Sequence, residues 1–446
     1  MQLSTFFRRP GRREAQVEPL AHRAPLLAVL LGASLAMPGL AACSDDDGPK
    51  GKVEMRDHVR IVWLRGTPYE MGLQHAELLR EELAEGRQYV GDDPLFSTML
   101  EYARIVGLDQ TAAEHSFEGI VEECQGLAEG TGGVWSLEDC LILNYGDVVV
   151  EVLKMEGIAC SQFVASGTAT VDGELLHGRN LDWWEVEIVE KYPVVFVREP
   201  KDRVPWVSVG FPANMSPYTG MNQAGIAVAS NEVSSPLETE VEREGRSNVQ
   251  MVREVLERAT TLEEAEAYLR SQDRASAEIL VVSDGPGKKA AAFEMTAHSF
   301  EARYLSADGV VYAANHFVHA DMEAAQEPEE PGTSSWNRFE RLRQLLEPGE
   351  PGTYHGQLDP AKGIEILRDR YNPTTETYED ATELNGRTLA TNGTMQSVIF
   401  LPAKGIMWLA VGEFPSTLLS FMGFSVGELT GVQGAPLPDP ASFPAV

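Results

Sequence analysis

The hydrophobic pattern of the chain changes at Cys160, and this change constrains the fold more than any other feature. Before it, segments such as MGLQHAELLREELAEG space their apolar residues three or four positions apart, which predicts amphipathic helices. After it, short runs such as CSQFVA, YPVVFVRE and EILVVS predict strands, interrupted by helical segments such as NVQMVREVLERA and WNRFERLRQLLE. The sequence therefore predicts an α+β fold built in layers.

Local signals mark where individual elements begin. An apolar run over residues 59–64 predicts a strand, and Thr67 with Glu70 forms a capping box that starts a helix directly after it. Thr261 and Glu264 form a second capping box in the later part of the chain. We expect a mainly helical segment over residues 59–159 and a strand-rich segment over residues 160–446.

The first 42 residues have the layout of a secretory signal. Five arginines lie in residues 1–24, and residues 25–42 carry no charge. Leu40-Ala41-Ala42-Cys43 resembles the lipobox of bacterial lipoproteins, which predicts removal of residues 1–42, a lipid on Cys43 and an acidic tether over residues 43–58. The protein is then exported and anchored to the bacterial membrane through Cys43. A retained transmembrane anchor is the alternative, because 18 uncharged residues are borderline for spanning.

Charge excludes one class of partner. The 446 residues include 36 Lys and Arg against 68 Asp and Glu, a formal net charge of −32. A surface able to neutralise nucleic-acid phosphates is not expected from such a chain. The nine histidines are scattered; His316, His319 and Asp321 form only a weak metal pattern, so we expect no metal and no cofactor.

The surroundings of Cys160 combine three reactive residue types. Cys160 begins a strand-turn-strand unit that ends in Gly-Arg-Asn-Leu-Asp-Trp, with Arg179 and Asp182 in the second strand. Taken alone, the cysteine would be a small buried apolar residue and the Arg–Asp pair a solvated one. Paired strands bring cross-strand neighbours within a few ångströms, so the combination predicts a thiol beside a guanidinium and a carboxylate.

This unit, C-S-x-F…G-x-A-T-x-D-G-x-x-x-x-G-R-N-L-D-W, resembles the start of the catalytic chain of N-terminal-nucleophile (Ntn) hydrolases. It is most similar to relatives of acyl-coenzyme A:6-aminopenicillanic acid acyltransferase, and next to choloylglycine hydrolases. The upstream motif GTPYEMGLQHA is similar to the opening of the acyltransferase relatives' propeptide-like subunit, which choloylglycine hydrolases lack. The resemblance covers residues 59–415 and implies a four-layer αββα sandwich with an N-terminal mainly helical segment.

The resemblance also implies a nucleophile made by self-cleavage. The chain would cut itself at Ala159-Cys160, and the freed α-amino group of Cys160, with a pKa of about 7.7–8.0, would serve as the base. Asp182 matches the aspartate that holds this amino-thiol head. Ala159 departs from the glycine that commonly precedes the cysteine in the fungal acyltransferase. The two fragments of the precursor, residues 43–159 and 160–446, are expected to stay associated.

Four further residues take roles from the resemblance. Asn315 matches the asparagine that donates to the tetrahedral oxyanion, and Arg338 matches the arginine that orders the site. Arg179 matches an arginine of choloylglycine hydrolases. Asn231 matches an asparagine of the same enzymes, although its spacing from the preceding motif is one residue shorter.

The cysteine count is consistent with this assignment. With Cys43 lipidated, three cysteines remain and cannot all pair within one chain. If a disulfide exists, it joins Cys124 and Cys140 and leaves Cys160 free; two unpaired helix-face cysteines are the alternative.

The function expected is a cofactor-independent amidohydrolase or acyltransferase that acts on small-molecule amides or acylated amino acids. Two alternatives remain open at this point. One is a cysteine dipeptidase of the same superfamily, and the other is a non-catalytic lipoprotein that binds an acylated ligand.

Overall fold

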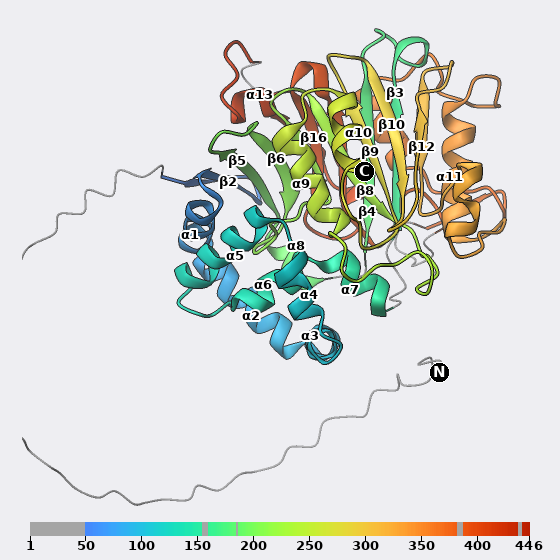
Figure 1. Cartoon of the computed structure of the whole chain (residues 1–446). Helices are drawn as coiled ribbons and strands as arrows, with labels where there is room; N and C mark the ends of the chain where they lie inside the picture. Colours follow the sequence, from blue (N-terminus) through green and yellow to red (C-terminus); the bar gives the residue numbers. More distant parts are fainter. Residues whose placement is uncertain (1–49, 154–158, 184–185, 381–386, 436–438) are drawn as a thin grey trace, which may run out of the picture. The chain divides into compact units, whose positions relative to one another are not determined.

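Two β-sheets form the centre of the fold (Figure 1). The computed structural model describes residues 50–153, 159–183, 186–380, 387–435 and 439–446. The larger sheet has the order β1 (Lys52–Arg56), β2 (Val59–Gly66), β5 (Val194–Pro200), β6 (Trp206–Gly210), β7 (Thr219–Asn222), β8 (Ile226–Glu232), β9 (Glu278–Asp284), β10 (Lys289–Met295) and β11 (Phe300–Tyr304). The smaller sheet has the order β12 (Val310–Ala313), β3 (Ala159–Ala165), β4 (Leu176–Asp182), β15 (Thr394–Leu401), β16 (Ile406–Val411) and β17 (Met422–Ser425). A separate short pair joins β13 (Tyr371–Asn372) to β14 (Thr377–Tyr378).

The two sheets pack face to face through alternate apolar side chains. One buried cluster joins Ile61, Val197 and Val207 of the larger sheet to Phe400 and Leu409 of the smaller one. Because successive side chains of a strand point to opposite faces, each strand in this region also offers apolar residues to the outer side of its sheet. Both outer faces are therefore available to helices.

Helices cover each outer face, which completes the four layers. The N-terminal helices are α1 (Pro68–Leu78), α2 (Arg80–Asp92), α3 (Pro94–Ile105), α4 (Leu108–His115), α5 (Glu118–Gly130), α6 (Leu137–Leu143) and α7 (Gly146–Leu153). They share one core with the larger sheet and with α9 (Asn248–Arg258) and α10 (Leu262–Arg270). On the smaller sheet lie α11 (Ser334–Leu346) and α12 (Pro360–Leu367). Short helices α8 (Glu187–Lys191) and α13 (Val426–Leu429) occupy connections. The predicted αββα sandwich is confirmed.

The structure of α1 explains the sequence of the upstream motif GTPYEMGLQHA. Thr67 accepts a hydrogen bond from the backbone N–H of Glu70, and the Glu70 carboxylate accepts one from the N–H of Thr67, as the capping box predicts. Gly72 and Gly126 let α1 and α5 approach closely: a Cβ at Gly72 would lie 2.1 Å from the carbonyl oxygen of Glu123. The upstream motif therefore encodes a helix start and a helix contact.

The helical and strand-rich segments do not form separate domains. Strand β2 precedes all seven N-terminal helices, yet it pairs in parallel with β5, with Arg60 opposite Val194 and Gly66 opposite Pro200. The segment expected over residues 59–159 thus contributes a strand to a sheet made mostly from residues 160–446. Its apolar helix faces are buried against that same sheet.

The expected tether over residues 43–58 is corrected in its second half. Residues Lys52–Arg56 form strand β1, which pairs antiparallel with β2. Its sequence KVEMR does alternate polar and apolar residues, but the run is short and its side chains are mostly exposed, so no buried face marks it as a strand. Charged side chains fix it instead, because Lys52 lies over the ring of Trp63 and Arg56 pairs with Asp439.

The predicted signal and lipobox of residues 1–42, Cys43 included, lie outside the described residues. Within the residues that the structure describes, no helix has the length and apolar character needed to cross a membrane.

Candidate active site

Cys160 is the second residue of β3 and is buried, with 1% of its surface exposed. Strand β3 pairs antiparallel with β4, with Ala159 opposite Asp182 and Gln162 opposite Arg179. The strand pairing predicted from the sequence is therefore present, and it places the predicted cleavage bond directly beside the predicted carboxylate.

Arg179 lies against the thiol. Its Nη2 is 3.5 Å from Cys160 Sγ and also donates to the carbonyl oxygen of Ser230 at 2.7 Å. Its Nη1 donates to the hydroxyl of Thr219 at 2.5 Å. These contacts hold a fully buried guanidinium where it can stabilise a thiolate.

The backbone of Cys160 is held by two predicted residues from distant parts of the chain. The N–H of Cys160 donates to Asn315 Oδ1 at 2.7 Å, and Arg338 Nη1 donates to the Cys160 carbonyl oxygen. Arg338 Nη2 also donates to Asn315 Oδ1 at 2.8 Å. Asn315 follows β12 and Arg338 lies in α11, so the smaller sheet and its helix layer together position the nucleophile.

The two asparagines use their amide N–H groups on backbone carbonyls. Asn315 Nδ2 donates to the carbonyl oxygen of Glu232 at 2.8 Å, and Asn231 Nδ2 donates to that of Ala314 at 2.8 Å. Asn231 Nδ2 is also 3.4 Å from the Cys160 carbonyl oxygen. Both residues thus lie at the site, but Asn315 faces Cys160 with its oxygen. Its role as an oxyanion donor stays a prediction, and it requires the side chain to rotate.

Asp182 is buried and only partly hydrogen-bonded. Its Oδ1 accepts from the hydroxyl of Thr394 at 2.6 Å, whereas Oδ2 has no hydrogen-bond partner within the described ranges of the chain. Burial raises the pKa of Asp182 to about 6, although Arg338 and Thr394 favour its charged form. An unsatisfied buried carboxylate oxygen is costly, so this group is suited to receive a new donor beside Ala159.

The thiol itself is weakly acidic in the uncut chain. Burial raises the pKa of Cys160 to about 11, in spite of the opposing effect of Arg179. At neutral pH the group is therefore a thiol, and a base must take its proton before it can act as a nucleophile.

A large apolar pocket lies next to the site. It has a volume of about 140 Å³ and is enclosed by helices α2, α3, α6 and α7 on one side and by Trp183, Phe211 and Tyr218 on the other. Asp139 is the one charged residue among its lining residues in the described chain, and it is paired with Arg87 and Arg104. A second, small pocket of about 20 Å³ contains Cys160 and shares Val150, Trp183 and Tyr218 with the large one.

Sequence reasoning missed the residues that hold the site residues in place. Thr394 binds Asp182, Thr219 binds Arg179, and the Ser335 hydroxyl accepts from the backbone N–H of Asn315 at 2.7 Å. Hydroxyl residues are common throughout such a chain, so no sequence signal singles these three out. Glu278, which lines the small pocket, did carry a signal, because it heads the otherwise apolar strand EILVVS.

One surface group has the donor atoms for a cation. In the described part of the chain, Glu301, His319 and Asp321 place ligand atoms within 4.8 Å of one another. His316 does not join them, because its Nδ1 lies 2.6 Å from the Ser335 hydroxyl.

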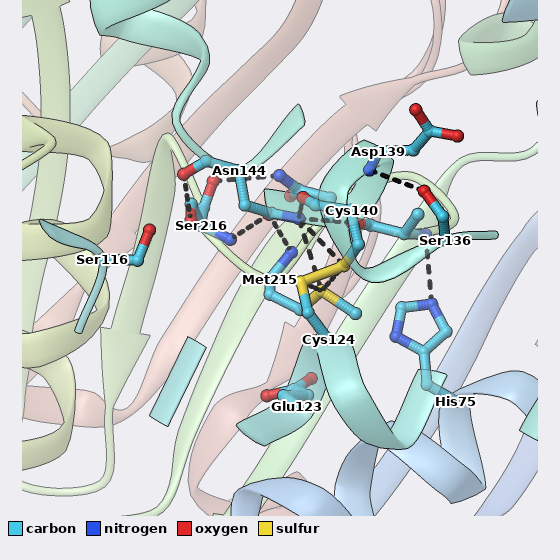
Figure 2. Close-up of a disulfide and its surroundings, with 12 residues drawn as sticks. His75, Ser116, Glu123, Cys124, Ser136, Asp139, Cys140, Asn144, Met215 and Ser216 are labelled. Carbon is cyan, nitrogen blue, oxygen red and sulfur yellow. Dashed lines mark hydrogen bonds between the residues drawn. A yellow bond between two sulfur atoms is a disulfide. The ribbon is translucent and has the colours of Figure 1, made fainter. Parts of the chain in front are cut away.

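The predicted disulfide is confirmed and lies in the helical layer (Figure 2). Cys124 of α5 is bonded to Cys140 of α6, and Cys160 is the free cysteine among the described residues. Asn144 and Met215 lie against the disulfide, and Asn144 Oδ1 accepts from the N–H of Met215 at 2.7 Å. The bond thus braces α6, which lines the apolar pocket.

Comparison with known proteins identifies related sequences. A family model described as acyl-coenzyme A:6-aminopenicillanic acid acyl-transferase matches residues 168–415, which include the five predicted site residues that follow Cys160. A protein of Archaeoglobus fulgidus described as uncharacterized is 26% identical over 400 residues. That alignment covers 79% of this chain, and the chain spans 65% of that relative's length.

Comparison with solved structures gives matches of low sequence identity and low TM-score. The Caenorhabditis elegans ortholog of N-acylethanolamine-hydrolyzing acid amidase has a TM-score of 0.37 and 15% identity, over 55% of this chain and 93% of that one. A mutant conjugated bile acid hydrolase from Clostridium perfringens has a TM-score of 0.38 and 14% identity, over 63% and 96%. Because these TM-scores are low, the αββα assignment rests on the sheets and cores described above.

Proposed function

We propose that this chain, which belongs to the acyl-coenzyme A:6-aminopenicillanic acid acyl-transferase family, is a self-processing cysteine amidase or acyltransferase. Cleavage at Ala159-Cys160 turns Cys160 into an N-terminal nucleophile. The observation that carries the proposal is the placement of the Cys160 thiol, N–H and carbonyl against Arg179, Asn315 and Arg338.

Cleavage supplies the base for repeated turnover, whereas self-cleavage is a single event that the small thiolate fraction beside Arg179 can carry out. With a thiol pKa of about 11, the uncut site holds little thiolate at neutral pH. A freed α-amino group has an ordinary pKa of about 7.7–8.0 and is covalently beside the thiol. It also provides the donor that Asp182 Oδ2 lacks, because Asp182 is paired with Ala159 across the strands.

Self-cleavage and substrate turnover use only the groups of Cys160, the reacting carbonyl and water. In self-cleavage, Cys160 Sγ attacks the Ala159 carbonyl carbon and forms a thioester, the C–N bond breaks, and the leaving nitrogen takes the proton that the thiol loses and becomes an amine. Water then hydrolyses the Ala159 thioester, which restores the thiol and releases a carboxylate. In turnover, the amine takes the thiol proton, the thiolate attacks the substrate carbonyl, and the proton passes to the leaving amine.

The negative charge that develops on the substrate carbonyl oxygen in the tetrahedral intermediate requires hydrogen-bond donors. Asn315 and Asn231 both place their side-chain amides against Cys160, and one of them exchanges its carbonyl partner for the oxyanion. Arg179 stabilises the thiolate. Water, or an amine in the transfer reaction, resolves the acyl-enzyme.

The apolar pocket favours a substrate with a long apolar acyl group. Its lining is apolar apart from the paired Asp139, and it shares walls with the pocket that holds Cys160. Burying each methylene of an acyl chain there contributes about 0.8 kcal/mol. This favours an acylated amine over a dipeptide as the substrate, and so favours the amidase over the dipeptidase alternative.

Fragment analysis of purified protein tests the proposal. Wild type should give two fragments, and N-terminal sequencing of the larger one should read Cys-Ser-Gln-Phe from Cys160. Cys160→Ala should stay a single folded chain without activity, and Cys160→Ser should cut slowly because a hydroxyl is the poorer nucleophile. A wild-type enzyme that is active as one uncut chain would contradict the proposed N-terminal-nucleophile mechanism.

We further propose export and lipid anchoring, on the lipobox residues alone. Cys43→Ser should move the protein from the detergent-soluble membrane fraction towards an unprocessed precursor. Processing and fractionation like wild type would show that the lipobox interpretation is wrong.

A further inference from the structure

Carboxylates from three different elements line the small pocket that contains Cys160. They are Asp147 of α7, Glu232 of β8 and Glu278 of β9. The pocket volume of about 20 Å³ is enough for one group of the size of a water molecule or an ammonium. The nucleophile therefore faces a confined site with an excess of acidic groups.

The acidic side chains of this pocket differ in the hydrogen bonds that they accept. Asp147 accepts hydrogen bonds from the Ser247 hydroxyl at 2.5 Å and from the N–H of Asn248 at 2.7 Å, at the start of α9. Glu278 is 2% exposed, and within the described residues its carboxylate has no hydrogen bond or ion pair. Glu278 is thus a buried acid that lines a pocket without a partner.

Strand pairing makes this arrangement costly in the absence of a ligand. Glu278 lies directly opposite Glu232 in the β8–β9 ladder, where like charges destabilise the pair. Burial and then Asp147 and Glu232 raise the pKa of Glu278 well above its ordinary value. Arg179 is the cation that opposes this effect, but its guanidinium is already bound to Thr219, Ser230 and the thiol.

We propose that Glu278 binds a cationic group on the amine half of the substrate. The preferred substrates are then amides in which a long acyl chain is joined to a diamine whose second nitrogen is protonated. The acyl chain occupies the apolar pocket, the carbonyl lies at Cys160, and the ammonium replaces the missing partner of Glu278. This inference rests on the proposed function and adds the charge of the leaving amine.

Three matched substrates test the charge preference. They share one acyl chain, and their amine halves are 1,3-diaminopropane, butylamine and 4-aminobutyrate, which end in an ammonium, a methyl and a carboxylate. For wild type, kcat/KM should be at least about tenfold higher for the ammonium substrate than for the methyl substrate, and lowest for the carboxylate.

A variant assigns the preference to Glu278. Glu278→Gln should lower kcat/KM for the ammonium substrate about tenfold or more, mainly through KM, and leave the methyl substrate within about threefold. Glu77→Gln, an acid-to-amide change at an exposed position of α1, serves as the matched control and should leave all three rates unchanged. An equal loss for all three substrates in Glu278→Gln would overturn the proposal.

An inhibition assay on wild type keeps the test independent of the variant's folding. Free 1,3-diaminopropane should compete with substrate at concentrations where butylamine does not, and equal inhibition by the two amines would overturn the proposal. A cut, active enzyme that prefers the methyl substrate refutes this inference alone. An uncut chain inactive on all three substrates refutes the proposed function as well.

Discussion

The molecule holds two clusters of buried charge, and they are built differently. In the first, Glu123 of α5 is paired with Arg198 at 3.2 Å and Arg253 at 2.6 Å, and Arg253 is also paired with Glu257 at 2.7 Å. Two carboxylates thus meet two guanidiniums. Burial raises the pKa of Glu123, but Arg253 and Arg198 outweigh it, so the pKa is lowered.

The second cluster, around Cys160, carries acids without matching cations. Asp182 Oδ2 has no hydrogen-bond partner and Glu278 has no ion pair among the described residues, while Arg179 and Arg338 are committed to Cys160 and its neighbours. Burial raises the pKa of both acids. The comparison teaches that equal burial serves opposite purposes: the balanced cluster joins the two segments, and the unbalanced one keeps carboxyl groups whose charged form a new donor or a cationic ligand would stabilise.

The largest effect is expected from breaking the balanced cluster. Glu123→Gln leaves Arg198 and Arg253 without their shared carboxylate, so the free energy of unfolding should fall by about 3–5 kcal/mol. Urea denaturation of the uncut Cys160→Ala chain measures it, with Glu122→Gln on the same helix as a control that should stay within about 0.5 kcal/mol. A loss no larger than that of the control would contradict a structural role for this cluster.

The disulfide supports the same helix, since Cys124 follows Glu123 directly. Replacing Cys124 and Cys140 together by Ser should lower the free energy of unfolding by about 3 kcal/mol. Thiol labelling of denatured, unreduced wild type, followed by peptide mapping, should mark Cys160 and spare the other two. Labelling of all three would show that the disulfide is absent in solution.

An acid-to-amide change in the second cluster should have the opposite sign. The pKa of Asp182 is raised to about 6. Asp182 therefore costs no stability below its ordinary pKa, and the free energy of unfolding falls as pH rises from that value through about 6. In the uncut Cys160→Ala chain, Asp182→Asn should therefore raise the free energy of unfolding by up to about 3 kcal/mol above pH 7 and leave it unchanged near pH 4. A loss of stability at both pH values would show that Asp182 is already paired before cleavage.

Glu278→Gln should also stabilise the uncut chain, by an amount that depends on pH. Because the pKa of Glu278 is raised well above its ordinary value, the unfolded chain releases this proton at a lower pH than the folded chain, so stability is lost progressively as pH rises from the ordinary pKa through the raised one. The variant of the uncut chain should match its parent below the ordinary carboxyl pKa and become increasingly the more stable of the two as pH rises above it. Parallel pH curves for the two proteins would mean that Glu278 has a partner in the precursor.

Much of the fold could be predicted because its signals are local. The capping box at Thr67 forms as expected, and the alternating runs after Cys160 become strands of two sheets. At the second box, Thr261 accepts from the N–H of Glu264, but the Glu264 carboxylate binds Thr260 instead of Thr261. The parallel pairing of β2 with β5 was not predictable, because no sequence pattern specifies which distant strands become neighbours.

The candidate site divides in the same way. Cys160, Arg179 and Asp182 lie in adjacent strands joined by a turn, so pattern alone places them together. Asn315 and Arg338 were found only through the resemblance. The orientation of the Asn315 amide and the unpaired carboxylate of Glu278 depend on contacts between residues far apart in the sequence, and these become visible only in three dimensions.

The contacts of the Cys160 backbone have a consequence for the life of the chain. During synthesis Cys160 emerges long before Asn315, Arg338 and Thr394, and these late residues complete its surroundings. A half-made or misfolded chain therefore lacks the apparatus to cut itself. Under the proposed mechanism, cleavage after residue 159 is irreversible and occurs only after the last strands have joined their sheet. The ratio of cut to uncut protein in a cell would therefore measure the fraction of chains that have folded.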